Sequence, residues 1–308
     1  MPMEEKRNLE GLGVAMLLLI SVGLGLNHVI IKLVNDGLQP VFAAGLRSVG
    51  AAFCVWLWMR FRGQRLDFRA GTIGAGLAIG VVFSIEFLGL FIALDLTTVT
   101  RTSVIFYSMP VWTAIMAHFL LPGERLTPVK LAGLALAMGG VVWAIADRDA
   151  GVPGTANIWG DLAALMGALG WMGVAILARV TSLNRVSPEM QMFWQLFISG
   201  PILLFAALFF GPFIRDLVPL HWVGLGYQTV VIAAAAFLAW FWLLNRYKAS
   251  AIASFAFLTP IISVGLGWLV LDEPMSASIA LKLALVAGGI VLINRPPKRQ
   301  VARPHPAE

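Results

Sequence analysis

The sequence predicts an all-α integral membrane protein of ten transmembrane helices, arranged as two inverted five-helix repeats around a central cavity. Composition, apolar runs and an internal repeat support this class. Hydrophobic residues make up 59% and charged residues 12% of the 308 residues, and the mean hydropathy is +0.85. Soluble domains average about 25% charged residues. Most of the surface of this chain must therefore meet lipid.

Ten apolar runs approach the roughly 20 residues that a helix needs to cross a hydrocarbon core about 30 Å thick. They cover residues 11–34, 40–59, 70–93, 98–121, 128–146, 157–180, 188–210, 220–244, 249–271 and 276–293. Strands of a transmembrane barrel would be about ten residues long and alternate in polarity. The runs are therefore expected to be helices, and the first is too long for the core of a signal peptide.

The placement of basic residues predicts the orientation. With the N-terminus inside, all but six of the 22 Lys and Arg residues fall in cytoplasmic segments. The exceptions are Lys32, Arg47, Arg101, Arg148, Arg215 and Lys282. Cytoplasmic loops of membrane proteins carry the excess of Lys and Arg. Both termini are therefore predicted to be cytoplasmic.

An internal repeat divides the chain into two halves. Each half has a proline within its fourth span, an acidic residue after that span and a glycine pair in the next. At an offset of about 150 residues, these are Pro110, Glu124 and Gly139-Gly140 in the first half and Pro260, Glu273 and Gly288-Gly289 in the second. An odd number of spans per half inverts the second copy, as in many secondary transporters. The predicted units are residues 1–148 and 149–294, followed by a disordered basic cytoplasmic tail, 295–308.

These repeated residues resemble the paired domains of the drug/metabolite transporter superfamily, in its EamA-type branch. The resemblance implies a secondary transporter of a bacterial inner membrane that exports small metabolites by alternating access. Amino acids, aromatic or bulky and neutral, are the leading substrate class. A multidrug or cationic toxin exporter is the alternative. Where the family often has tryptophan in the first span this chain has Leu24, whereas Trp171 keeps it in the second half.

The motifs of other function classes are missing from the sequence. It has no GxxxxGK phosphate-binding loop and no serine in a nucleophile-elbow pattern. Its four histidines and single cysteine have no metal-ligand spacing, so we expect no enzyme, cofactor or metal site. The basic residues lie in clusters between apolar runs, which disfavours nucleic acid as a partner. The expected partners are a small-molecule substrate and the bilayer, with the monomer functional. A membrane enzyme or non-transporting scaffold is the remaining alternative class.

The two matched prolines indicate where a cavity would lie. Pro110 and Pro260 both fall near the middle of their spans, where each removes a helical hydrogen bond and frees the carbonyl of Phe106 or Ala256. Interrupted helices at matched positions mark the substrate site in inverted-repeat transporters. The side chains expected to line it are Ser103, Tyr107, Pro110, Trp171, Phe257 and Pro260.

Two charges lie deep in the predicted spans. Arg47 and Glu86 are each several residues from a span end, where isolated charges are costly and usually face the bundle interior. They are predicted to form a buried ion pair, or else Glu86 serves as a proton or amine site. Asn27 and His28, nearer the end of the first span, are expected to meet interfacial water.

Overall fold

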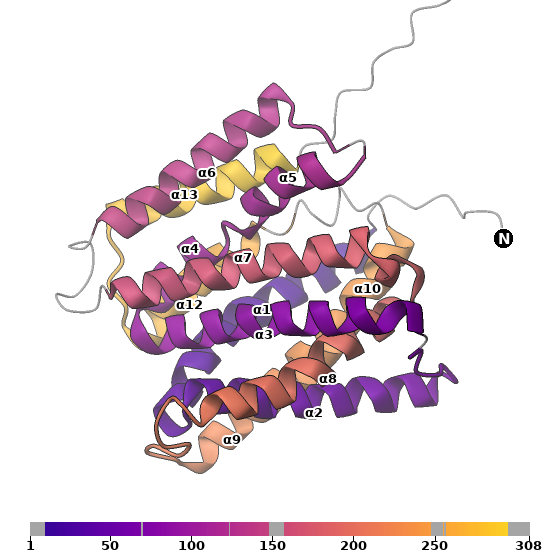
Figure 1. The fold of residues 1–308 in the computed structure, drawn as a ribbon. Coiled ribbons are helices and arrows are strands. Elements are labelled where there is room, and N and C mark those ends of the chain that lie inside the picture. Colours follow the sequence, from indigo (N-terminus) through magenta and orange to yellow (C-terminus); the bar gives the residue numbers. More distant parts are fainter. Residues whose placement is uncertain are drawn as a thin grey trace, which may run out of the picture.

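The computed structural model describes residues 10–68, 70–122, 124–147, 157–247, 255 and 257–294. Helices make up most of this part of the chain, shown in Figure 1. The α-helices are α1 (Gly11–Gly37), α2 (Pro40–Phe61), α3 (Ala70–Leu96), α4 (Val99–Phe106), α5 (Met109–Leu120), α6 (Pro128–Ala146), α7 (Ile158–Val180), α8 (Pro188–Ala207), α9 (Pro219–Gly226), α10 (Phe237–Arg246), α12 (Leu258–Leu271) and α13 (Ala277–Ile293). A 3₁₀ turn, η1 (Ser182–Arg185), precedes α8, and a π-helical stretch, η2 (Tyr227–Ala236), joins α9 to α10.

The predicted all-helical membrane class is confirmed. Within the described residues, eight helical stretches are long and apolar enough to cross a bilayer, counting α4 with α5 as one and α9, η2 and the start of α10 as another. The helices α12 and α13 are apolar but shorter. The start of the predicted ninth span lies outside the described residues, and with it Ala256 and its carbonyl.

Side chains of Ser, Thr, Asn and Gln set where several helices begin. The Thr98 hydroxyl accepts a hydrogen bond from the Arg101 amide at the start of α4. The side chains of Thr127, Ser187 and Ser276 cap α6, α8 and α13 in the same way. These caps satisfy amides that have no partner within the helix. Each of these helices therefore begins at a residue that the sequence marks.

The helices pack in pairs that join the two halves of the chain. In Figure 1, α6 lies along α13 at the top and α2 lies beside α8 at the bottom. Between these pairs, α3 packs against α7 and α8, and α1 packs against α12. The helix α7 also contacts α4 and α5, while α1 also contacts α9, η2 and α10.

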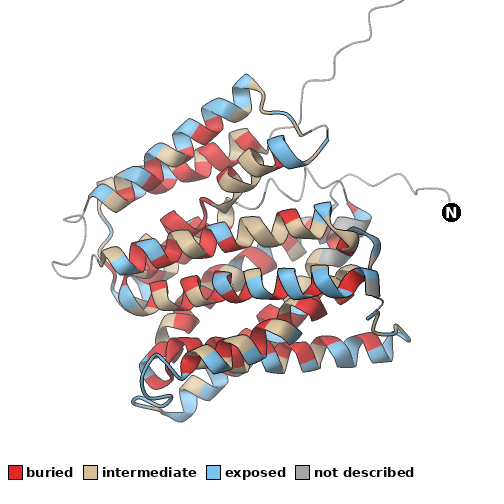
Figure 2. Cartoon of the chain, in the orientation of Figure 1, coloured by how far each residue is buried: buried red, intermediate tan, exposed pale blue. Residues whose placement is uncertain are grey.

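Burial follows the same arrangement. In Figure 2, buried positions lie where helices face one another, and exposed positions lie on outward faces. Large apolar side chains on those faces are widely exposed, including Leu19, Phe119, Trp159 and Leu269. In water such a surface would be an aggregation hazard, but it suits contact with lipid.

Candidate solute site in the bundle core

The fourth span is interrupted at its middle. The helix α4 ends at Phe106, Tyr107 and Ser108 form a turn, and α5 starts at Met109 with Pro110 in its first turn. The described part of the ninth span is similar, because α12 starts at Leu258 with Pro260 in its first turn. Proline fits the first turn of a helix, where its missing amide costs no hydrogen bond. Pro110 and Pro260, which the sequence predicts to kink continuous helices, instead each lie in the first turn of a new helix.

Polar side chains from neighbouring helices contact the residues at the break in the fourth span. His28 Nδ1 and Ser103 Oγ are 3.1 Å apart and share a hydrogen bond. The His28 ring lies 5.6 Å from the Tyr107 ring and 5.9 Å from the Phe106 ring, centroid to centroid. The Tyr107 phenol interacts with the side chain of Thr259, which precedes Pro260. Residues at the break in the fourth span therefore contact both α1 and α12.

Arg47 and Glu86 are both buried, with 2% and 1% of their surfaces exposed. They form no ion pair with each other, and Arg47 Nε and Nη1 and Glu86 Oε2 have no hydrogen-bond partner within the part of the chain that the structure describes. The Arg47 guanidinium instead lies over aromatic rings, 4.4 Å from the Phe87 centroid and 5.8 Å from that of Phe91. Electrostatic interactions still link Arg47 to both Glu86 and His28.

Other polar groups share this depth. Asn27 Oδ1 on α1 and both amide atoms of Gln228 on η2 are buried and have no hydrogen-bond partner among the described residues. At 1.5 Å per residue, His28, Arg47 and Glu86 lie about 10–15 Å from one end of the bundle, near the middle of a bilayer core. We call that end the Gly37 end, because α1 ends there and α2 and α4 begin there. The polar layer consists of Asn27, His28, Arg47, Glu86, Tyr107 and Gln228.

Ion pairs and charged hydrogen bonds join the two halves at the Gly37 end. Arg101 pairs with Asp161 at 2.5 Å, Arg215 with Asp95 at 2.6 Å and Lys282 with Asp147 at 2.7 Å. Glu273 accepts hydrogen bonds from the amides of Val99 (2.6 Å) and Thr100 (2.9 Å) at the start of α4. The Asp95 carboxylate raises the pKa of Arg215 above its ordinary value by hydrogen bonding to it. At the Gly37 end, charged groups of the first half of the chain are therefore paired with groups of the second half.

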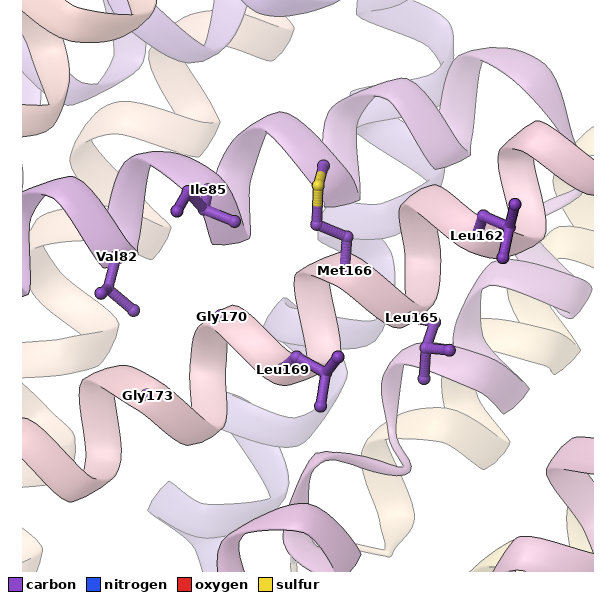
Figure 3. Close-up of a pocket in the computed structure, with 8 residues that line it drawn as sticks. All are labelled: Val82, Ile85, Leu162, Leu165, Met166, Leu169, Gly170 and Gly173. Atoms are coloured by element: carbon purple, nitrogen blue, oxygen red, sulfur yellow. The ribbon is translucent and has the colours of Figure 1, made fainter. Parts of the chain in front are cut away.

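A hollow on the outer surface offers nothing for a polar solute. It has a volume of about 470 Å³ and lies between α3 and α7, as Figure 3 shows. Its lining is apolar throughout, consisting of Val82, Ile85, Leu162, Leu165, Met166, Leu169, Gly170 and Gly173. Ile85, Leu162 and Leu169 are exposed, which suits contact with acyl chains.

The structure brings some of the expected site residues together. Ser103 and Tyr107 are buried beside His28, and Pro260 is buried next to Thr259. Pro110 is half-buried on α5. Trp171 on α7 and Phe257 before α12 are half-buried and pack against the main core, with no ring contact to Tyr107 in the described part of the chain.

Asn27 and His28 correct a sequence expectation. They do not meet interfacial water, because they are buried with 4% and 3% of their surfaces exposed. The apolar run ends at Val34, but α1 continues to Gly37 and places both residues deeper. Gln228 and Thr259 were not singled out by the sequence. A polar residue within an apolar run was their only signal.

Buried polar groups at mid-depth in a bundle of apolar helices are typical of multi-span membrane proteins with a solute pathway. The model of the EamA-like transporter family matches residues 11–146 and again 158–295. The chain therefore belongs to the EamA-like transporter family, and the match to two tandem copies confirms the resemblance of both halves.

Similar proteins carry transporter names. The uncharacterized transporter YoaV of Bacillus subtilis is 24% identical over 90% of this chain and 95% of its own length. The "Probable amino-acid metabolite efflux pump" of Escherichia coli is 27% identical over 89% of this chain and 92% of its own. The uncharacterized inner membrane transporter YedA of E. coli is 21% identical over 88% and 86%. A crystal structure 22% identical to the chain has the same fold, with a TM-score of 0.64 over 91% of this chain and 95% of the other.

Proposed function

We propose that this protein is a secondary transporter that exports small metabolites, most of all aromatic or bulky neutral amino acids, by alternating access. The observation that carries the proposal is the polar layer, in which Asn27, Arg47 and Glu86 of the first half and Gln228 of the second have buried atoms without a hydrogen-bond partner among the described residues. Polar groups within membrane spans are costly and usually mark a solute pathway. The family and the efflux pump among its relatives support export.

We further propose that the protein works as ten helices in two inverted repeats around a central cavity. Contacts between α6 and α13 support this. A Cβ on Gly140 would lie 2.9 Å from the Lys282 carbonyl, and one on Gly289 would lie 2.6 Å from the Gly133 carbonyl. At the offset that pairs Gly140 with Gly289, Gly133 pairs with Lys282, so these two contacts are symmetry mates.

The proposed cavity lies where the fourth and ninth spans are broken. Ser103, Tyr107, Pro110 and Pro260 surround this point, and we retain Trp171 and Phe257 as candidates for lining it from the second half. The proposed location is a bacterial inner membrane with both termini in the cytoplasm. The E. coli relative YedA is named an inner membrane transporter, which supports the inner membrane as the location.

Flux from proteoliposomes tests the function. Vesicles are loaded with a radiolabelled amino acid, phenylalanine or leucine, or with a lipophilic cation such as tetraphenylphosphonium. Faster loss of amino acid than from protein-free vesicles supports the proposal. If no solute leaves faster, the transport function is wrong and a membrane enzyme or scaffold becomes the better interpretation.

A multidrug or cationic toxin exporter is the second candidate. The observation in its favour is Glu86, a buried carboxylate with an unpartnered oxygen inside the bundle. A cation needs such a counter-charge, but it would leave Arg47 unmatched. Selective loss of tetraphenylphosphonium in the same assay would favour this candidate.

A further inference from the structure

Arg47 and Glu86 differ from most other charges within the spans of this protein. Arg101 and Lys282, which also lie on predicted spans, make direct ion pairs with Asp161 and Asp147. Arg47 and Glu86 are at least as buried, yet neither forms an ion pair with another described residue. Burying a charge costs several kcal/mol unless a partner offsets it. Two opposite charges left unpaired at one depth indicate that the partner is a ligand.

The surroundings offer these charges little else. The Arg47 guanidinium faces the rings of Phe87 and Phe91, which attract a cation but accept no strong hydrogen bond. The nearby His28 is already bonded to Ser103. The Asp95 and Glu273 carboxylates toward the Gly37 end are held by Arg215 and by the start of α4. Arg47 therefore has free donors, and Glu86 has a free acceptor.

We propose that Arg47 and Glu86 bind the two charged ends of a zwitterionic α-amino acid. Arg47 binds the carboxylate and Glu86 binds the ammonium group. The planar guanidinium fork matches a carboxylate in geometry and charge, and a carboxylate accepts hydrogen bonds from an ammonium group. A zwitterion satisfies both groups at once and keeps the site neutral. A lipophilic cation or a simple carboxylate would satisfy one and leave the other unpaired.

The rings beside the pair favour an apolar side chain on this ligand. Phe87 and Phe91 flank Arg47, and Phe106 and Tyr107 lie around His28. Aromatic faces bury an apolar or aromatic group without requiring a polar partner. The inference rests on the proposed transport function and narrows its substrate to α-amino acids with free charged ends.

End-group analogues test the site on the wild-type protein. Binding of phenylalanine, phenethylamine and 3-phenylpropionate to the purified full-length chain is measured by calorimetry or by displacement of labelled phenylalanine. We expect each analogue to bind about tenfold or more weakly than phenylalanine, because it leaves a buried charge unpaired. Equal binding of phenylalanine and either analogue would overturn the assignment of the corresponding residue.

Two variants assign the ends separately. In Arg47→Gln, phenylalanine and phenethylamine should bind with similar affinity, because the carboxylate is no longer recognised. In Glu86→Gln, phenylalanine and 3-phenylpropionate should bind with similar affinity. Arg62→Gln is the matched control, since Arg62 follows α2 and is exposed with its side chain near Trp58. This control should keep the wild-type preferences.

The outcomes separate this inference from the proposed function. If amino acids leave the vesicles but both variants keep the wild-type preference among the three ligands, the zwitterion site is wrong and transport stands. If no amino acid binds or moves, the transport function itself is wrong. Where a variant does not fold, the analogue series on the wild-type chain still decides.

Discussion

Gly170 determines how closely α7 approaches α3 beside the proposed site. A Cβ at Gly170 would lie 2.7 Å from the Cα of Glu86, closer than side-chain carbons approach backbone. Small residues allow such approaches between membrane helices. The backbone that carries Glu86 is therefore positioned by the absence of a side chain on α7.

We expect Gly170→Ala to destabilise the protein by about 1–3 kcal/mol, because the new methyl group overlaps backbone that cannot move freely. Gly139→Ala is the control, since a Cβ at Gly139 on α6 meets nothing within 4 Å. That change should be neutral, or stabilising by up to about 1 kcal/mol, because alanine favours helix. Thermal unfolding in detergent measures both, and equal destabilisation would contradict the close contact.

The charge pair yields a second prediction at this scale. Since no hydrogen bond joins Arg47 to Glu86, the double variant Arg47→Met with Glu86→Gln should show a coupling energy of about 1–2 kcal/mol, as expected for separated charges. A direct buried pair would lose about 3–5 kcal/mol when one partner is removed. Unfolding of the wild type, both single variants and the double variant measures the coupling. A value in the larger range would mean that the two residues pair in a further conformation.

The sequence identified Arg47, Glu86, Ser103 and Tyr107 because charged or polar groups deep in apolar runs are unusual and can be recognised without a structure. It did not show that Arg47 faces Phe87 rather than Glu86. That choice depends on how α2 and α3 rotate against each other, and the spacing within one helix carries no information about rotation between two.

Among the elements, α4 is capped at its N-terminus from both halves of the chain, by Thr98 of its own half and by Glu273 of the other. Glu273, with 6% of its surface exposed, accepts hydrogen bonds from the Val99 and Thr100 amides. A carboxylate at this position satisfies free amides and interacts favourably with the helix dipole. Its repeat mate, Glu124, has a side chain 45% exposed and makes longer contacts, 3.5 Å to Lys130 and 3.8 Å to Arg179.

Glu273→Gln should therefore lower stability by about 1–2 kcal/mol, because a neutral amide accepts more weakly from the α4 amides. Glu124→Gln should change stability by less than about 1 kcal/mol, since exposed ion pairs contribute little. Chemical or thermal denaturation of the two variants side by side measures the difference. If Glu124→Gln were the more damaging of the two, the capping role assigned to Glu273 would be wrong.

The extents of the helices were largely predictable. The run 128–146 matches α6, and the other described spans agree to within a few residues, because apolar length and Pro or Ser/Thr at helix starts fix both ends. The break at Tyr107 and Ser108 was expected as a kink at Pro110. The π-helical stretch η2 had no signal in the sequence, since no Gly or Pro lies within 227–236.

For the whole molecule, the structure explains the basic residues that depart from the predicted orientation. Of the six exceptions, Arg148 lies outside the described residues. Arg101, Arg215 and Lys282 each have a carboxylate partner. Lys32 donates to the carbonyls of Leu94 and Thr97. The sixth, Arg47, is buried among helices with its guanidinium over the Phe87 and Phe91 rings. Lys32, Arg101, Arg215 and Lys282 are thus held at the Gly37 end by internal partners, so they oppose the excess of Lys and Arg at the other end less than free charges would.

The proposed orientation rests on that asymmetry and is open to a direct test. Fusions of alkaline phosphatase and of green fluorescent protein after Arg65 and after Glu308 should be fluorescent and lack phosphatase activity, since both sites are predicted to be cytoplasmic. A fusion within the α8–α9 connection, at Gly211, should show the reverse pattern. Lys282→Met should leave all three results unchanged, because a lysine paired with Asp147 inside the bundle does not act as a free topological charge. Phosphatase activity at Arg65 or Glu308 would show that the proposed orientation is wrong. The Gly37 end would then face the cytoplasm.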